Sequence, residues 1–185
     1  MQTTTIDVGV GELQPWAGKE KGFPPSHLDG WAMIHASLTR NLKDWESALA
    51  GARDRLTSNK LDGKHASWVA LNLATWWSMH GHAMHDHHDA EETIFFPAFA
   101  QKFALPARFT ESHAVLVDEM AAMESALVKL LEAASCTRAE VPPKSPFGDV
   151  SPLLGWAHNG GEAQRDKMLD ALQELQSVHS RCARV

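Results

Sequence analysis

The stretch HDHHDAEETIFFP, residues 85–97, raises the question on which the fold and the chemistry of this chain depend. Its three histidines and four carboxylates stand directly before an apolar run that ends at Pro97. His88 and Glu92 are four residues apart, so on a helix their side chains share one face and can reach one metal ion. A solvated acidic face is the alternative for a pair that stands alone. Here the pair is in phase with an apolar helical stripe from Leu71 to Phe99, which favours a site inside the protein.

Apolar residues recur at three-to-four-residue spacing on both sides of this stretch, and no segment shows the alternation typical of a strand. The first predicted helix begins at Ser26, where Ser26 and Asp29 form a start signal, and it ends before a turn at residues 57–64. The second helix is expected to bend near its end, since Pro97 lacks a backbone donor. The last three predicted helices cover residues 64–103, 107–134 and 162–181.

One domain accounts for the helical part of the chain, because 185 residues suffice for a single sizeable core. Residues 1–25 are predicted to be an extended tail, and residues 26–185 carry the predicted helices. Residues 135–152 contain four prolines and are predicted to be a loop, whereas glycines leave residues 153–161 ambiguous. Helices with mostly short connections bury their apolar faces against one another, so we expect an all-α, up-down-up-down four-helix bundle.

Composition and charge exclude several classes of partner. The formal net charge is −6 and the Lys and Arg residues are scattered, so neither a nucleic acid nor an anionic membrane surface is an expected partner. No apolar run approaches the roughly 18 residues of a membrane helix, and the N-terminus lacks the features of a secretory signal. Cys136 and Cys182 form no CxxC pair, and we interpret them as free thiols of a cytoplasmic protein.

Histidines on two other predicted helices lie near the level of the His88–Glu92 pair. His35 stands beside the apolar stripe of the first helix, and His113 occupies a core position near the start of the third. In an up-down bundle these positions share one end, and at about 1.5 Å rise per residue they fall within a few turns of one layer. Three histidines and a carboxylate that converge in one layer indicate a bound metal ion, because unpaired polar groups are costly to bury.

The segments IHASLTRNL around His35, HHDAEETIFFP around His88 and Glu92, and ESHAVL around His113 resemble the hemerythrin-like, or HHE cation-binding, domain over residues 27–181. The resemblance implies a four-helix bundle with a pair of non-haem irons in its core, with a single iron as the alternative. It implies His35, His88, Glu92 and His113 as metal ligands, and Glu92 as the carboxylate that bridges two metals. Imidazole and carboxylate ligands also suit zinc and manganese, so it is the resemblance that favours iron.

Two ligands of the family pattern are missing from this chain. Hemerythrins carry His-x-x-x-His on the third helix, whereas Val117 stands four residues after His113. On the last helix, His179 matches the level of the site, but no acid follows it. His158 and Glu162 have the His-x-x-x-Glu spacing but stand at the other end of that helix. We therefore prefer His179 as the fifth metal ligand and keep His158 as the alternative.

Other residues of the second helix can complete or support the site. His85, Asp89 and Glu91 are close enough along the chain to replace the missing ligands. The remaining histidines of the region are interpreted as solvent-facing or supporting residues: His65, His80, His82 and His87.

The leading functional interpretation is a non-enzymatic iron protein that binds or senses dioxygen, nitric oxide or iron itself. The position left open by Val117, beside an apolar wall, suits a small diatomic ligand. The first alternative is an iron enzyme that consumes peroxide or reduces nitric oxide, which catalytic turnover would distinguish from a carrier. The second alternative is a metal-free helical bundle that binds a partner protein, and the two missing ligands support it.

Overall fold

The computed structural model describes residues 30–58, 60, 63–138, 153 and 155–183 of this chain. The expected tail at residues 1–25, the predicted helix start at Ser26 and most of the predicted loop lie outside these ranges. Within them the chain is almost entirely helical apart from one small hairpin, so the all-α class predicted from the sequence is confirmed. No helix among these residues combines the length and the apolarity that crossing a membrane requires.

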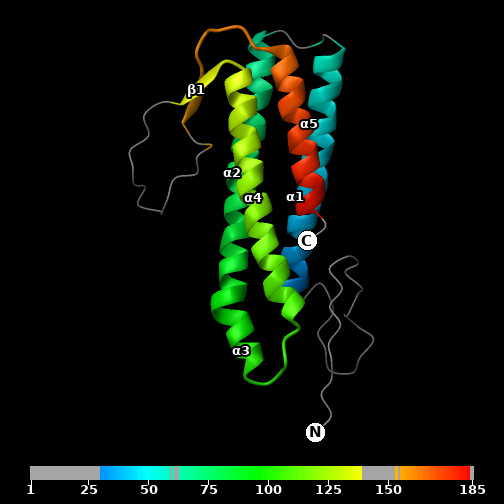
Figure 1. The fold of residues 1–185 in the computed structure, drawn as a ribbon, viewed down its shortest axis with the longest axis vertical. Coiled ribbons are helices and arrows are strands. Elements are labelled where there is room, and N and C mark those ends of the chain that lie inside the picture. Colours follow the sequence, from blue (N-terminus) through cyan, green and yellow to red (C-terminus); the bar gives the residue numbers. More distant parts are fainter. Residues whose placement is uncertain (1–29, 59, 61–62, 139–152, 154, 184–185) are drawn as a thin grey trace.

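Long helices dominate the described residues, and short elements connect them (Figure 1). The long helices are α1 (Gly30–Thr57), α2 (Gly63–Ala90), α4 (Ala107–Ala133) and α5 (Arg165–Cys182). Between α2 and α4 lie the π-helical turn η2 (Glu91–Phe95) and the short helix α3 (Phe96–Ala100). Between α4 and α5, β1 (Cys136–Arg138) and β2 (Trp156–His158) form an antiparallel pair.

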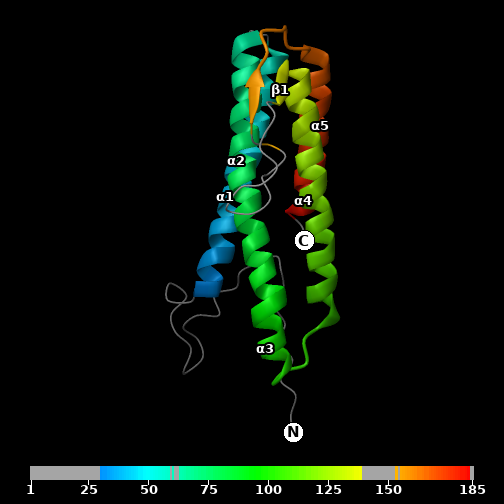
Figure 2. The ribbon, with the colours of Figure 1, turned by 90° about the vertical axis from the view of Figure 1, so that its left-hand side faces the viewer.

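The long helices lie side by side along the longest axis of the molecule (Figures 1 and 2). α1 packs against α2 and α5, and α4 packs against the same two helices. Burial of a large apolar side chain stabilises the fold by about 1.5–3 kcal/mol relative to exposure. The fully buried core residues include Trp45, Trp77, Met123, Leu130 and Leu172. At the end of the molecule that carries α3, α2 and the start of α4 extend beyond the last residue of α5 (Figure 1).

The helices predicted from residue 64 onward are confirmed with shifted ends. The predicted helix at residues 64–103 corresponds to α2, η2 and α3 together, and α4 ends one residue before residue 134. α5 begins at Arg165 rather than at Glu162, because Gln164 has an extended backbone and stands outside the helix.

Pro97 changes the backbone hydrogen bonding of the helix in the turn that precedes it. Its ring removes one N–H donor and, inside a regular helix, clashes with the carbonyl four residues earlier. The chain forms the π-helical turn η2 at this place, where Phe96 N–H bonds the carbonyl of Glu91, five residues back. Pro97 then stands in the first turn of α3, where no N–H donor is needed. The helical path therefore continues to Ala100 through one widened turn.

The sequence predicts no strand, whereas the structure contains the β1–β2 hairpin. Each strand has three residues, too few for an alternating pattern to appear in the sequence. Ser135, with φ of 56°, turns the chain out of α4. The buried Ser67 hydroxyl of α2 donates to the carbonyl of Ala134 at 2.5 Å and lies 3.0 Å from His158 Nδ1. These contacts fix the hairpin at the start of α2.

Candidate metal centre

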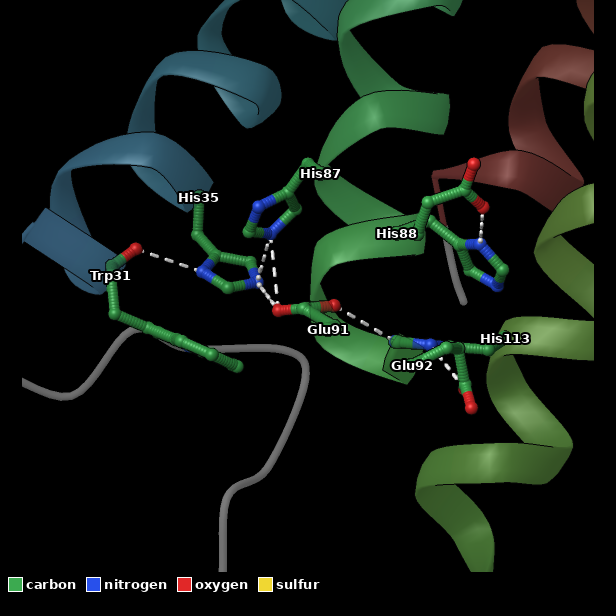
Figure 3. A network of polar contacts seen from close by, with 8 residues as sticks. Trp31, His35, His87, His88, Glu91, Glu92 and His113 are labelled. Carbon is green, nitrogen blue, oxygen red and sulfur yellow. Dashed lines mark hydrogen bonds and ion pairs between the residues drawn. The ribbon is translucent and has the colours of Figure 1, made fainter. Parts of the chain in front are cut away.

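Two overlapping His-x-x-x-Glu pairs occupy the end of α2 and the start of η2. His87 is four residues before Glu91, and His88 is four residues before Glu92. Each pair meets a histidine from a different helix, which makes two groups of three candidate ligands. Within each group the ligand atoms lie within 4.8 Å of one another. Figure 3 shows both groups where α1, η2 and α4 come together.

The first group consists of His35 on α1 with His87 and Glu91. Glu91 Oε1 lies 3.1 Å from His87 Nε2 and 3.4 Å from His35 Nε2. The Nε2 atoms of the two histidines are 3.2 Å apart. Three donor atoms from two helices thus converge on one point, as the ligands of a metal ion do.

The second group consists of His88 and Glu92 with His113 on α4. His113 Nδ1 lies 2.8 Å from Glu92 Oε1, and the rings of His88 and His113 have centroids 4.8 Å apart. All three residues are half-buried. Four of the five ligands expected from the sequence therefore lie at one end of the molecule, with His35 in the first group and the other three in the second.

Glu91 connects the two groups. Its Oε1 faces the first group, while its Oε2 lies 3.1 Å from His113 Nε2 (Figure 3). Glu91 is 3% exposed, and no other carboxylate among the described residues is buried. Its Oε1 accepts no hydrogen bond from the described residues, although His87 Nε2 and His35 Nε2 lie 3.1 and 3.4 Å away. Buried carboxylates in proteins are commonly paired with a cation or coordinate a metal ion.

Supporting contacts orient two of the histidines. His35 Nδ1–H donates to the carbonyl of Trp31 at 2.9 Å, which leaves Nε2 facing Glu91. His88 Nδ1 lies 3.2 Å from Asp89 Oδ1, which leaves its Nε2 available. A metal-bound imidazole usually donates its second ring N–H to a carbonyl or a carboxylate, and both contacts have that form.

The pKa of His87 is lowered from its ordinary value of 6.5. Burial is the largest cause, the Glu91 carboxylate acts in the opposite direction, and the neighbouring histidines lower the pKa further. His87 is therefore neutral at physiological pH. A neutral imidazole has the lone pair that a metal ion needs, whereas an imidazolium does not.

Aromatic rings line one side of the centre. The ring centroid of Trp31 lies 5.2 Å from that of His35 and 5.2 Å from that of Phe95. The buried Phe96 has its ring 5.0 Å from the ring of His113. These rings keep water from part of the centre, while the side chain of His35 is 33% exposed and leaves the first group accessible to small molecules.

His179, the fifth ligand expected from the sequence, belongs to neither group. It is buried on α5, and its Nε2–H donates to the carbonyl of Leu42 at 3.0 Å. Leu42 is seven residues after His35 on α1, which is about 10 Å along the helix. His179 is expected at the same level of the bundle as the other ligands. It lies at another level because α5 ends at Cys182, before it reaches the layer of the two groups.

The alternative pair, His158 and Glu162, lies at the opposite end of the molecule. His158 contacts Ser67, which is twenty residues before His87 on α2 and so about 30 Å away along the helix. Glu162 is exposed in the segment before α5. Neither residue belongs to a candidate ligand group.

Of the three residues considered as replacement ligands, only Glu91 belongs to a group. Asp89 is exposed and contacts His88 from outside. His85 lies near Glu124 of α4, where burial raises the pKa of Glu124 and His85 partly offsets the increase. Glu91, the first residue of η2, is therefore the candidate replacement for one missing ligand.

His87 differs most from its sequence-based interpretation, because it is a candidate ligand and not a solvent-facing or supporting residue. The His-x-x-x-Glu spacing alone does not separate two pairs that are offset by one residue. The buried line that runs along α2 into η2 does separate them. Buried residues recur there at seven-residue steps, at Ala70, Trp77, Met84 and Glu91, and each is at most 5% exposed. A heptad count would therefore have favoured Glu91 as the innermost carboxylate.

Each group offers two imidazoles and one carboxylate, a set that holds non-haem iron and leaves coordination positions open. Similar sets hold zinc and manganese. Glu91, with one oxygen toward each group, is placed to bridge two ions. No protein-family model, no curated protein and no solved structure matches the chain.

Proposed function

We propose that this chain is a non-haem iron protein of the hemerythrin-like kind, in which α1, α2, α4 and α5 form an up-down-up-down four-helix bundle. Two iron ions would occupy the two ligand groups, and the centre would bind or sense dioxygen or nitric oxide. The resemblance of three sequence segments supports this proposal, as does the convergence of their histidines at one end of the helices.

The buried carboxylate of Glu91 is the observation that carries the proposal. It lies between three histidines, with Oε1 toward His35 and His87 and Oε2 toward His113. A metal ion on each side would balance the negative charge of this carboxylate. The cost of burying the carboxylate is then offset by coordination, in the same way that buried charges elsewhere are paired or bind metals.

The residues around the groups suit a small ligand. Bound iron supplies coordination positions where a diatomic molecule attaches reversibly, and three protein atoms per group leave such positions open. Trp31 and Phe95 cover one side with apolar rings, and the partly exposed His35 marks a route of entry. The chain therefore combines ligand access with restricted access of bulk water.

The test is ligand binding by protein purified from iron-replete culture without chelator. After anaerobic reduction, nitric oxide or dioxygen should change the absorption spectrum, and removal of the gas should restore it. His87→Ala, which deletes a ligand of the first group, should reduce the change. His82→Ala is the matched control, since His82 is an exposed histidine of the same helix. Iron-loaded protein whose spectrum ignores both gases would contradict the proposal.

An iron enzyme is the second candidate function, favoured by the open ligand set and by the 33% exposure of the His35 side chain. Two histidines and one carboxylate are also the ligands of many non-haem iron oxygenases. Catalysed loss of hydrogen peroxide over many turnovers per chain would favour the enzyme, whereas reversible binding without turnover favours the carrier or sensor.

A metal-free interaction bundle is favoured by one set of contacts. His113 contacts Glu91 Oε2 and Glu92 Oε1, so the polar groups partly satisfy one another without a metal. This alternative predicts that purified protein contains no metal. It also predicts that, in the presence of added iron, the His88→Ala variant melts at the same temperature as the wild type.

A further inference from the structure

The π-helical turn η2 begins at the two neighbouring carboxylates of the candidate centre. Glu91 and Glu92 are its first two residues, and the bond from Phe96 N–H to the carbonyl of Glu91 spans five residues instead of four. A π-helical turn has more residues per turn than an α-helix and is rare, and it occurs frequently at functional sites. Its position at the two carboxylates therefore points to a role in the candidate centre.

The consequence concerns the directions of the two carboxylates. Adjacent side chains on an α-helix diverge by about 100° around the helix axis. Because more residues share a π-helical turn, each step along it rotates the chain by less. Glu91 and Glu92 both reach the same imidazole: His113 Nε2 lies 3.1 Å from Glu91 Oε2, and His113 Nδ1 lies 2.8 Å from Glu92 Oε1 (Figure 3). The turn thus brings two successive carboxylates to one partner.

The cause is Pro97. If α2 continued as a regular helix, residue 97 would donate to the carbonyl of Thr93, and a proline cannot donate and clashes with that carbonyl. The widened turn separates α2 from α3, so that Pro97 falls in the first turn of α3. Without this proline nothing on the described backbone prevents regular α-helical bonding, which is the more favourable form for these residues.

We infer that Pro97 is a positioning residue, and that the π-helical turn it maintains is what joins the two ligand groups into a two-ion centre. In a regular helix Glu91 and Glu92 would diverge further. With Glu91 held by His35 and His87, Glu92 would turn away from His113, and the second group would lose its carboxylate. The inference rests on the proposed metal-binding function. It adds to that function the structural reason for two ions instead of one.

Pro97→Ala is the direct test, because alanine restores the N–H donor and removes the ring. In the full-length variant, metal content should fall from an ion in each group to an ion in one group. The metal-free variant should melt at or above the wild-type temperature, since regular α-helical bonding replaces the π-helical turn and alanine is the best helix former. Lower metal content with equal or higher stability is a combination that simple structural damage does not produce.

Amide hydrogen exchange of the metal-free proteins provides a readout that needs no metal. Restored α-helical bonding should slow exchange in residues 91–97 of the variant relative to the wild type. Pro106→Ala is the matched control, because Pro106 precedes α4 outside the π-helical turn and its replacement should leave metal content unchanged.

The outcomes separate the inference from the proposed function. A wild-type protein that binds no metal overturns the function, and the exchange experiment still decides whether Pro97 maintains the turn. A Pro97→Ala protein that holds the wild-type amount of metal, or that shows unchanged exchange at residues 91–97, overturns the inference. A variant that loses metal together with stability also overturns it, because general unfolding then explains the loss.

Discussion

Glu91 is the side chain on which the proposed centre depends most. Among the residues that the structure describes, it is the one carboxylate that contacts histidines of both groups, and it is 3% exposed. Glu92 contacts His113 of the second group, and its side chain is 30% exposed. We therefore expect Glu91 to contribute more to metal binding than Glu92, although the two residues have the same side chain and are adjacent in the sequence.

Glu91→Gln and Glu92→Gln should separate these roles. Glutamine keeps the shape of each side chain and removes its charge. We expect Glu91→Gln to weaken binding of both ions by at least about 10–100-fold. That range is typical for the replacement of a residue that only hydrogen-bonds a metal ligand. Glu92→Gln should weaken only the ion of the second group. Equilibrium titration with metal, read by metal content per chain, measures both effects, and equal losses in the two variants would contradict the bridging position of Glu91.

His80 is a buried histidine that the candidate centre does not use. It is 5% exposed, and neither ring nitrogen has a hydrogen-bond partner among the described residues. Its pKa is lowered, first by burial and then by His179, whose own pKa is also lowered, mainly by burial. A buried polar group without a partner costs about 1–3 kcal/mol. The sequence interpretation of His80 as solvent-facing or supporting did not anticipate this burial.

His80→Leu should therefore stabilise the metal-free protein by about 1 kcal/mol or more. A lowered pKa in the folded state means that the unfolded chain binds protons more readily. The two histidines therefore add no pH-dependent penalty above about pH 6.5, and stability falls as pH drops from there toward their lowered folded-state pKa values. Urea unfolding at about pH 7.5 and about pH 5 should show a smaller pH dependence in His80→Leu. An unchanged dependence would contradict the assignment.

At the residue scale, the sequence identifies most of the candidate ligands but not how they divide into groups. Helical spacing and level matching correctly bring His35, His88, Glu92 and His113 to one end of the molecule. They do not resolve which of two overlapping pairs points inward, because a shift of one residue preserves the spacing. That choice depends on the phase of the whole apolar stripe of α2.

The elements divide the molecule into an end that carries the candidate metal centre and an opposite end that is tied together by long-range contacts. At the tied end, the β1–β2 hairpin is attached to α2 through Ser67, which is 1% exposed. Arg165, the first residue of α5, donates from its Nε and from one terminal nitrogen to the last carbonyls of α1, those of Leu56 and Thr57. These long-range contacts close the end opposite the candidate centre and give His158 a structural role.

Ser67→Ala tests this separation of roles. Loss of the hydroxyl leaves the buried carbonyl of Ala134 without this donor, so we expect destabilisation by about 1–3 kcal/mol. Metal content should not change. Ser125→Ala is the matched control, because the Ser125 hydroxyl bonds a carbonyl on the exposed side of α4 and its removal should cost less than about 0.5 kcal/mol. Chemical denaturation gives the stabilities, and metal loss in Ser67→Ala would contradict the separation.

Helices are predictable from this sequence and their interruptions are not. A stripe at three-to-four-residue spacing is a local signal that persists over many residues, so α2 and α4 follow from it. To predict the π-helical turn, one must know where along the helix the clash of Pro97 is relieved. The spacing of the apolar residues does not contain that information. The hairpin depends on contacts between residues far apart in the chain, such as Ser67 with His158, which no local pattern contains.

The whole molecule places its polar centre in a part of the helix assembly that α5 does not reach. The apolar core lies mainly along α5 and the facing parts of the other long helices, where Trp45, Leu130 and Leu172 are fully buried. Near the centre, side chains such as Ile34, Phe95 and Phe99 are more than a third exposed. Coordination of metal is therefore expected to stabilise this end more than apolar packing does.

Bound metal should consequently raise the stability of the whole protein. A metal at a free concentration 100-fold above its dissociation constant adds about 2.7 kcal/mol for one site that exists only in the folded state. Removal of metal by a chelator should lower the melting temperature of the wild type, and added iron should restore it. His87→Ala should respond less than His82→Ala. A melting temperature that is the same with iron and with chelator would contradict tight binding at this end.

The metal content of the wild-type protein tests the central claim most directly. The protein is expressed in iron-replete medium, purified without chelator and analysed by elemental analysis alongside Glu91→Gln. We expect iron in an amount that corresponds to one ion in each of the two groups, and a large loss in the variant. Wild-type protein without metal, or metal that is retained in full by Glu91→Gln, would contradict the assignment of a two-ion centre around Glu91.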